Sequence, residues 1–252
     1  MCKRPIFLVL LVISIVLSSC VPKKKVIYFQ DVGDFETIVN KNNFIPKFKV
    51  DDLVSIFIST EDEEVSKPFN LYRGGQENGR GGAPVDYLID KDGNIDFPLL
   101  GKLKIAGLSP DEVRTLLQKK LDYLKDPIIN IRLKNFTVTM LGFVNRKGTY
   151  NVNGERINIM EAIGMAGGLD IKGRRDNIMV MRDFNGAKVY HRIDITSKKV
   201  TESPAFYLTQ NDIVYVEPNS SAVSSSSMDN RASMYLSIAS LIITSSIILI
   251  RN

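Results

Sequence analysis

The sequence has no tryptophan, one histidine and two cysteines among its 252 residues. The histidine, His191, lies in a predicted strand, and we interpret it as a surface residue rather than a general base. The acidic run Glu61–Glu64 lacks the spacing of an EF-hand, so we interpret it as a solvated loop. We find no metal triad and no nucleophile motif. The sequence therefore does not predict an enzyme, and it assigns no catalytic residue, no metal ligand and no cofactor.

Basic segments interleaved with aromatic side chains are also missing. The formal net charge of +5 falls to about +3 once Lys3 and Arg4 leave with the leader described below. Nucleic-acid binding is therefore not predicted. The glycine-rich segment 74–82 contains no GxxxxGK[ST] phosphate loop. We expect it to form an exposed, mobile loop.

The N-terminus has the pattern of a secretory leader. A short basic head is followed by about a dozen apolar residues, Ile6–Leu17, which are too few to span a membrane. The next residues, Leu17-Ser18-Ser19-Cys20, resemble the lipobox of bacterial lipoproteins, which implies a diacylglycerol thioether on Cys20. An ordinary signal peptide with a cysteine at this point is the alternative. Loss of Cys2 and acylation of Cys20 would leave no free thiol.

The C-terminal part changes composition abruptly after Pro218. Residues 220–227 are mostly serine and predict a flexible linker. Residues 232–250 then contain no charge, and as a helix they would extend about 28 Å, close to the thickness of a bilayer core. This run predicts a single membrane-spanning helix.

Small hydroxyl residues follow helical spacing within that run. Ser233, Ser237, Ser240 and Thr244 are separated by four, three and four positions, which places them on one helix face. Such a stripe favours close packing of helices or a wet, pore-facing surface. The alternative is a simple anchor in which these hydroxyls bond to their own backbone.

The body of the chain predicts an α+β fold. In its first half, residues 53–58 read as a buried strand, and residues 85–89 and 94–97 as a hairpin around Asp90–Gly93. A helix begins at Ser109, with Pro110 at its first position and Glu112 placed to close a capping box, and it runs to about Leu124. A weakly alternating strand at 130–133 leads into the second half.

The second half begins with another hairpin, whose strands are residues 136–144 and 149–152. A short helix follows, with Asn158 as its N-cap and Gly167-Gly168 as its stop. Its apolar stripe consists of Ile159, Ala162, Ile163 and Ala166. Two more strands are expected at 178–181 and 189–195. The segment from Asp212 echoes Asp52-Leu53-Val54, and we attribute this echo to chance or to family character.

Two stretches resemble one known family. Gly142, Gly148-Thr149-Tyr150 and Ala166-Gly167-Gly168 resemble the soluble-ligand-binding β-grasp (SLBB) repeat of Wza-like outer-membrane polysaccharide export lipoproteins. Lys147 stands where that repeat usually has proline. The order dGxIxxPxLGxxxxxGLsxxE, from Asp92 to Glu112, resembles the polysaccharide export (PES) domain of the same family. The approach to the first strand also resembles that domain, with Asp51 where glycine is usual.

The resemblance divides the chain into six segments. They are a lipoprotein signal peptide (1–19), an N-terminal tether (20–45), a PES domain (46–134), an SLBB β-grasp domain (135–218), a serine-rich linker (219–231) and a transmembrane helix (232–250). It implies a lipid-anchored protein of the outer membrane with a periplasmic body. The fold class expected is α+β, with one C-terminal transmembrane helix.

The resemblance also implies a function. Subunits would form a ring-shaped homo-oligomer that exports capsular polysaccharide or exopolysaccharide, with energy supplied by an inner-membrane polysaccharide co-polymerase. Arg174 and Arg175, in a basic segment expected to be a loop, are candidate contacts for polymer or partner, although a solvated turn explains them equally well. The alternative function is a periplasmic glycan-binding or scaffolding lipoprotein whose C-terminal helix is only an anchor.

Overall fold

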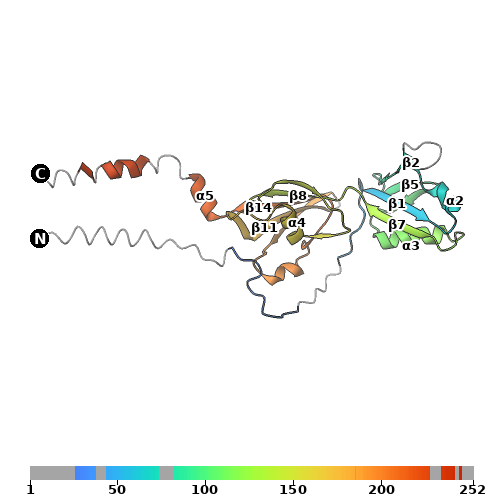
Figure 1. Cartoon of the computed structure of the whole chain (residues 1–252), viewed down its shortest axis with the longest axis horizontal. Coiled ribbons are helices and arrows are strands. Elements are labelled where there is room, and N and C mark those ends of the chain that lie inside the picture. Colours follow the sequence, from blue (N-terminus) through green and yellow to red (C-terminus); the bar gives the residue numbers. More distant parts are fainter. Residues whose placement is uncertain are drawn as a thin grey trace.

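The computed structural model describes residues 26–37, 44–73, 82–184, 186–227, 234–241 and 244–245. The body consists of two domains that lie end to end, each with its own hydrophobic core (Figure 1). Leu133, at the junction, packs against both cores. The predicted signal peptide, Cys20, most of the glycine-rich segment and Ser233 lie outside the described residues.

The first domain is built on a small antiparallel sheet. Strand β1 (Leu53–Ser59) lies between β4 (Tyr87–Leu88) and β7 (Ile128–Leu133). Val54, Ile56 and Ile58 alternate toward the core and are buried, which confirms the predicted buried strand. The smaller elements are α2 (Glu63–Ser66), η2 (Lys67–Phe69), β2 (Tyr72–Arg73) and β3 (Ala83–Pro84).

The predicted hairpin of the first domain is wrong in its pairing. Strand β5 (Asn94–Phe97) pairs with β6 (Gly101–Lys104), whereas β4 pairs with β1. The expected turn does form, because the Gly93 N–H donates to the Asp90 carbonyl over 2.9 Å. A second tight turn, in which the Leu100 N–H donates to the Pro98 carbonyl, returns β6 onto β5.

Helix α3 (Pro110–Lys120) begins as predicted. The Ser109 N–H donates to the Glu112 carboxylate over 2.7 Å, and the Glu112 N–H donates to the Ser109 hydroxyl over 3.2 Å. This reciprocal capping box confirms the predicted helix start. The helix ends four residues earlier than predicted, because Leu121 leaves the helical backbone conformation. Leu121 and Leu124 are nevertheless buried, so the apolar pattern continues beyond the helix.

The second domain contains a five-stranded mixed sheet in the order β12-β11-β14-β8-β9. Its strands are β8 (Thr137–Gly142), β9 (Gly148–Asn151), β11 (Gly173–Phe184), β12 (Ala187–Ile193) and β14 (Asp212–Pro218). Strands β14 and β8 are parallel and the other neighbours are antiparallel. The β8–β9 pairing confirms the second predicted hairpin. Strand β10 (Ile157–Asn158) pairs with β13 (Tyr207–Leu208), and η3 (Lys198–Glu202) lies between β12 and β13.

Helix α4 (Ile159–Met165) packs on the buried side of this sheet. Asn158 caps it, with Glu161 closing the capping box, as the sequence predicts for the cap. The four residues of its predicted apolar stripe are all buried. Gly167 and Gly168 follow at φ angles of 74° and 87°, a left-handed conformation that ends the helix.

Gly142 allows β8 and β14 to approach each other closely. Its φ is +80°, and a Cβ atom at this position would lie 2.1 Å from the Val216 carbonyl oxygen. No side chain fits at that separation. The glycine shared with the SLBB repeat is therefore required both by the backbone conformation and by the space available.

The serine-rich segment is not an irregular linker throughout. Residues Ser220–Ser227 form helix α5, at the end of the second domain opposite the first domain (Figure 1). The Asn219 carbonyl side chain accepts from the Ala222 N–H over 2.9 Å, and Ala222 is buried. The hydroxyls of Ser225 and Ser226 donate to carbonyls three residues earlier. The prediction of a flexible linker is thus wrong for these residues, because a cap and one buried alanine stabilise the helix.

The N-terminal segment, expected to be a tether, is attached to the second domain where it is described. The Gln30 N–H donates to the Thr196 carbonyl over 2.7 Å. The Asp31 carboxylate accepts from the Ser197 hydroxyl and from the Lys198 N–H, and these bonds lower the pKa of Asp31. Tyr28 and Phe29 pack against the core of the domain. We call residues 26–37 the N-terminal strap.

Candidate functional site

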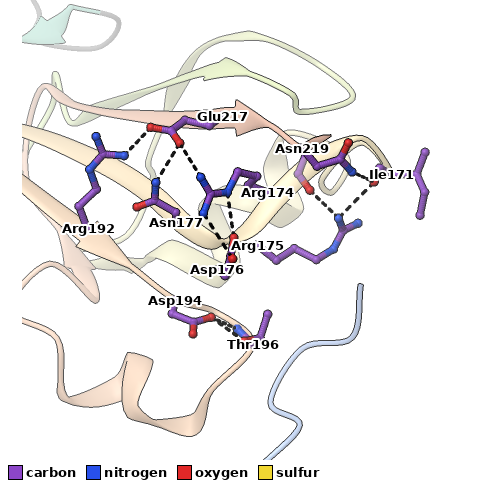
Figure 2. Close-up of polar contacts among 11 residues, drawn as sticks. Ile171, Arg174, Arg175, Asp176, Asn177, Arg192, Asp194, Thr196, Glu217 and Asn219 are labelled. Carbon is purple, nitrogen blue, oxygen red and sulfur yellow. Dashed lines mark hydrogen bonds and ion pairs between the residues drawn. The ribbon is translucent and has the colours of Figure 1, made fainter. Parts of the chain in front are cut away.

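The two predicted contact arginines lie at the start of β11 rather than in a loop. The Arg174 guanidinium donates from Nε to Asp176 over 3.1 Å and from Nη1 to Glu217 over 3.3 Å (Figure 2). The hydrogen bond to the Asp176 carboxylate raises the pKa of Arg174 above its usual value. The side chain is partly exposed, and its three hydrogen bonds leave guanidinium N–H groups for a further contact.

Arg175 is buried, with 5% of its surface exposed. Its Nη1 donates to the Gly173 carbonyl over 2.8 Å, and its guanidinium carbon lies 5.8 Å from the centre of the Tyr28 ring in the N-terminal strap. A register shift between Gly173 and Ile178 accompanies this inward placement. The prediction that Arg175 is a surface contact is therefore wrong. Its side chain holds the strap against β11.

Glu217 organises a polar cluster on the same end of the sheet, and sequence analysis missed it. Its carboxylate accepts from Arg192, from Asn177 over 2.8 Å and from Arg174 (Figure 2). The hydrogen bond from Arg192 is the largest cause of a lowered Glu217 pKa. The three donors come from two strands, so only the pairing of β12, β11 and β14 brings them together. The cluster satisfies its own charges.

The sequence echo corresponds to a repeated turn. Asp51 and Asn211 both have left-handed backbone conformations, with φ angles of 68° and 65°. Each is followed by a buried aspartate whose carboxylate accepts from a backbone N–H three residues earlier. Asp52 accepts from Lys49 over 2.8 Å, and Asp212 accepts from Thr209 over 2.8 Å. Asp51 therefore adopts a left-handed backbone conformation that glycine takes up more readily than other residues.

The two repeated turns meet at the domain junction. The Lys49 Nζ, from the first turn, donates to the Thr209 hydroxyl of the second over 3.1 Å. Asn135, between the domains, accepts from the Leu53 N–H and donates to the Asp51 carbonyl. The Lys49–Thr209 bond thus joins the two domains, and the Asn135 side chain fixes the connecting residue to the first domain.

An ion pair anchors the second turn. The Arg182 guanidinium donates to both carboxylate oxygens of Asp212, with a shortest distance of 2.7 Å, and also to the Tyr207 carbonyl. Asp212 is fully buried and Arg182 is nearly so. A buried carboxylate needs such a partner, because its charge has lost the surrounding water.

A groove of about 830 Å³ lies between the two turns. It is within the size range of small-molecule sites. Burial raises the pKa of Asp52 in its wall to about 6, and burial lowers the pKa of Lys49. The lining residues are Lys47, Phe48, Lys49, Val50, Asp51, Asp52, Ala106, Gly107, Met181, Asp183, Phe184, Gly186, Lys188, Gln210, Asn211 and Ile213. We call this the junction groove. No local sequence pattern predicts it, because its walls come from segments far apart in the chain.

The described part of the C-terminal hydroxyl stripe is helical and exposed. The Ser240 hydroxyl donates to the Ser237 carbonyl over 2.8 Å, and the Thr244 hydroxyl donates to the Ser240 carbonyl over 2.7 Å. These bonds are the ones expected of a simple anchor. Among the residues that the structure describes, no helix is both long enough and apolar enough to cross a membrane.

Within the described ranges, no group of three or more His, Cys, Asp or Glu side chains is arranged to hold a metal ion. His191 lies on β12, which confirms the predicted strand, and it is partly buried.

Comparison with protein families matches each domain separately. Residues 46–134 match the family model described as polysaccharide biosynthesis/export protein, and residues 136–216 match the model of the SLBB domain. The boundary between the two matches falls at Asn135, whose side chain bonds to Asp51 and Leu53 of the first domain.

Two curated relatives share part of the sequence, and both are named EPS I polysaccharide export outer membrane protein EpsA. The protein from Ralstonia solanacearum is 26% identical over 137 residues, which cover 52% of this chain and 36% of the relative. The protein from Ralstonia nicotianae is 30% identical over 96 residues, which cover 36% of this chain and 25% of the relative. The matched part of this chain thus spans about a third or less of either relative.

Proposed function

We propose that this chain is a subunit of a polysaccharide exporter. It contains a polysaccharide biosynthesis/export domain followed by an SLBB domain, and it is homologous to named polysaccharide export proteins of the outer membrane. The observation that carries the proposal is the presence of both domains, in this order, in one chain. The substrate class is capsular polysaccharide or exopolysaccharide. No step of catalysis is assigned to the chain.

The exporter is proposed to be a ring of identical subunits in the outer membrane. One helix cannot enclose a pore, so a channel built from segment 232–250 needs several copies of the chain arranged in a closed symmetric ring. The absence of charge from this segment supports its place in the membrane. A helical barrel would also satisfy every backbone hydrogen bond within the bilayer.

The remaining parts of the proposal concern attachment and partners. Cys20 is the proposed lipidation site, which anchors the chain while its main body occupies the periplasm. An inner-membrane polysaccharide co-polymerase is the proposed source of energy. Arg174 and the glycine-rich segment 74–82 are the proposed points of contact with polymer or partner, since Arg175 is buried.

A second candidate is a periplasmic glycan-binding or scaffolding lipoprotein with a C-terminal anchor. The hydroxyls of Ser240 and Thr244 favour it, because both donate to backbone carbonyls of their own helix rather than pointing away from the helix surface. An anchor of this kind needs no ring and no defined copy number.

The deciding experiment is the native mass of the full-length lipoprotein in mild detergent, measured beside a version truncated after Ser227. A discrete, ring-sized oligomer that loses its membrane-embedded part on truncation supports the exporter. A monomer or dimer in both forms, in several detergents, supports the glycan-binding lipoprotein. Polysaccharide released by cells that lack the chain, with and without a plasmid copy, provides the functional readout.

A further inference from the structure

The lining of the junction groove includes a buried amide with an unused donor. Gln210 is 8% exposed, and its Oε1 accepts from the Thr137 N–H over 2.8 Å. That bond fixes the orientation of the amide, because an NH₂ group cannot accept from an N–H. Its Nε2 has no acceptor among the described residues, and it is not sealed from solvent. The donor therefore faces the groove.

Asp52, another residue of the lining, offers an acceptor. The residue is 2% exposed, and one carboxylate oxygen is used by the Lys49 N–H. The other oxygen has no partner in the described part of the chain and is likewise not sealed from solvent. Half-buried Lys49 adds an ammonium with three N–H donors, of which Thr209 occupies one. Donor, acceptor and ammonium are thus held by turns that the fold already fixes.

Apolar side chains make up much of the remaining wall. Phe184 stands at the rim with 60% of its surface exposed, and Met181, Ile213 and Val50 line the groove with it. An exposed aromatic ring beside fixed hydrogen-bonding groups suits a ligand that has an apolar face and a polar edge. Pyranose rings have this character, since their C–H bonds gather on one face and their hydroxyls lie around the edge.

The charge of the groove selects among saccharides. Three lysines line it, and three aspartates balance them. One of these pairs, Lys188 with Asp183, is already an ion pair. A groove without net charge gives no electrostatic advantage to a uronic acid or a phosphate. The ligand that fits is uncharged.

We propose that the junction groove is a binding site for a short, uncharged saccharide segment, held by the Gln210 amide, the Asp52 carboxyl and Lys49 and packed on the Phe184 ring. The identification of a saccharide rests on the proposed export function, which brings such a polymer to the protein. The site lies between the two domains, so an occupied groove also bridges them.

Saturation-transfer NMR of the full-length protein in mild detergent tests the site. The probes are maltotetraose, cellotetraose and mannotetraose, with tetragalacturonic acid as the charged comparison. Phe184→Ala removes the exposed ring, and Val50→Trp fills the groove. Phe35→Ala is the matched control, because Phe35 is a fully exposed phenylalanine of the N-terminal strap outside the groove.

At least one neutral tetraose is expected to receive saturation from the wild type and from Phe35→Ala. Its affinity should fall about tenfold in Phe184→Ala and further in Val50→Trp. The site is overturned if no neutral tetraose binds, if only the charged tetramer binds, or if binding survives in both groove variants. A fall in native mass in Val50→Trp without sugar binding assigns the groove to a second copy of the chain and also overturns the proposal.

Polysaccharide release by cells carrying the same variants separates the two proposals. Release that continues while the groove binds no sugar refutes the site alone and leaves the export function standing. If cells that carry the wild-type chain release no polysaccharide, and the chain serves no other purpose in those cells, the export function is refuted.

Discussion

Lys49 and Thr209 are 160 positions apart in the chain, and the Lys49 Nζ donates to the Thr209 hydroxyl over 3.1 Å. Each residue opens one of the two repeated turns, so this single bond joins the first domain to the second at equivalent points. The relative position of the domains therefore depends on side chains that each domain orders independently.

Replacing Lys49 with methionine should loosen the junction. The substitution keeps most of the side-chain volume but removes the bond to Thr209, a loss of about 1 kcal/mol or a factor of about five in an opening equilibrium. Trypsin cleavage after exposed Lys134 is expected to accelerate by that factor. Lys47→Met is the control, because Lys47 is exposed at the same groove. Equal cleavage in both variants would contradict the role of Lys49.

The Arg182–Asp212 pair should be costly to break. Asp212→Asn leaves the nearly buried Arg182 without its counter-charge, and a loss of about 3 to 5 kcal/mol is expected. Asp183→Asn, which breaks the exposed pair with Lys188, should cost less than about 1 kcal/mol. Urea unfolding monitored by circular dichroism measures both. A small effect of Asp212→Asn would mean that water reaches Arg182.

Asp52 should make the protein less stable as the pH rises. Burial raises its pKa from 3.8 to about 6, so the folded state holds the proton more tightly than the unfolded state. Stability from this group is then complete below pH 3.8 and is lost as the pH rises toward 6, by about 3 kcal/mol at most.

Asp52→Asn isolates that contribution, because an asparagine oxygen can still accept from the Lys49 N–H but does not titrate. The free energy of unfolding of the variant minus that of the wild type should increase between pH 4.5 and pH 7.5, because only the wild type loses stability as Asp52 ionises. Urea titrations at the two values measure the double difference, in which the other carboxyl groups cancel. A difference that does not change with pH would show that Asp52 is solvated in the native state.

Gly142→Ala should severely destabilise the second domain. The added Cβ would lie 2.1 Å from the Val216 carbonyl, which requires β8 and β14 to separate. Gly186→Ala is a close control, because Gly186 has the same φ of +80° and open space around it. The control should lose only about 1 kcal/mol, the cost of left-handed backbone for alanine. Similar thermal shifts in the two variants would refute the steric explanation.

The hydroxyl stripe distinguishes the two candidate functions. Changing Ser237, Ser240 and Thr244 together to leucine preserves an apolar helix, so an anchor should tolerate it, whereas a helical barrel should lose close packing or its wet face. Polysaccharide release and native mass are the measurements. Leu236→Ile is the control for a change outside the stripe. Unaltered release from the triple variant would remove the pore role from this segment.

Local signals in the sequence were the reliable ones. The capping box of α3 and the Asn158 cap of α4 each need only residues three positions apart, and both formed as predicted. Strand β1 and the β8–β9 hairpin followed from alternation and turn residues. In such cases the interacting groups are close along the chain, so few alternative arrangements compete with the predicted one.

Long-range relationships were missed or predicted wrongly. Strand β4 pairs with β1 instead of with the predicted partner at residues 94–97. Arg175 is buried at a register shift within β11 instead of exposed in a loop. Helix α5 depends on the Asn219 cap and on a buried alanine, which outweigh the low helix propensity of serine. The junction groove needs both domains. None of these features has a signature within a single window of sequence.

The N-terminal strap limits how far the body can move from a lipid on Cys20. Val26, where the described strap begins, is only six positions after Cys20, and a fully extended chain of that length reaches about 20 Å. Because the Tyr28 ring of the strap lies against the Arg175 guanidinium, this short connecting segment leads directly to the second domain. A lipidated chain would therefore hold the second domain near the bilayer surface and direct the first domain away from it.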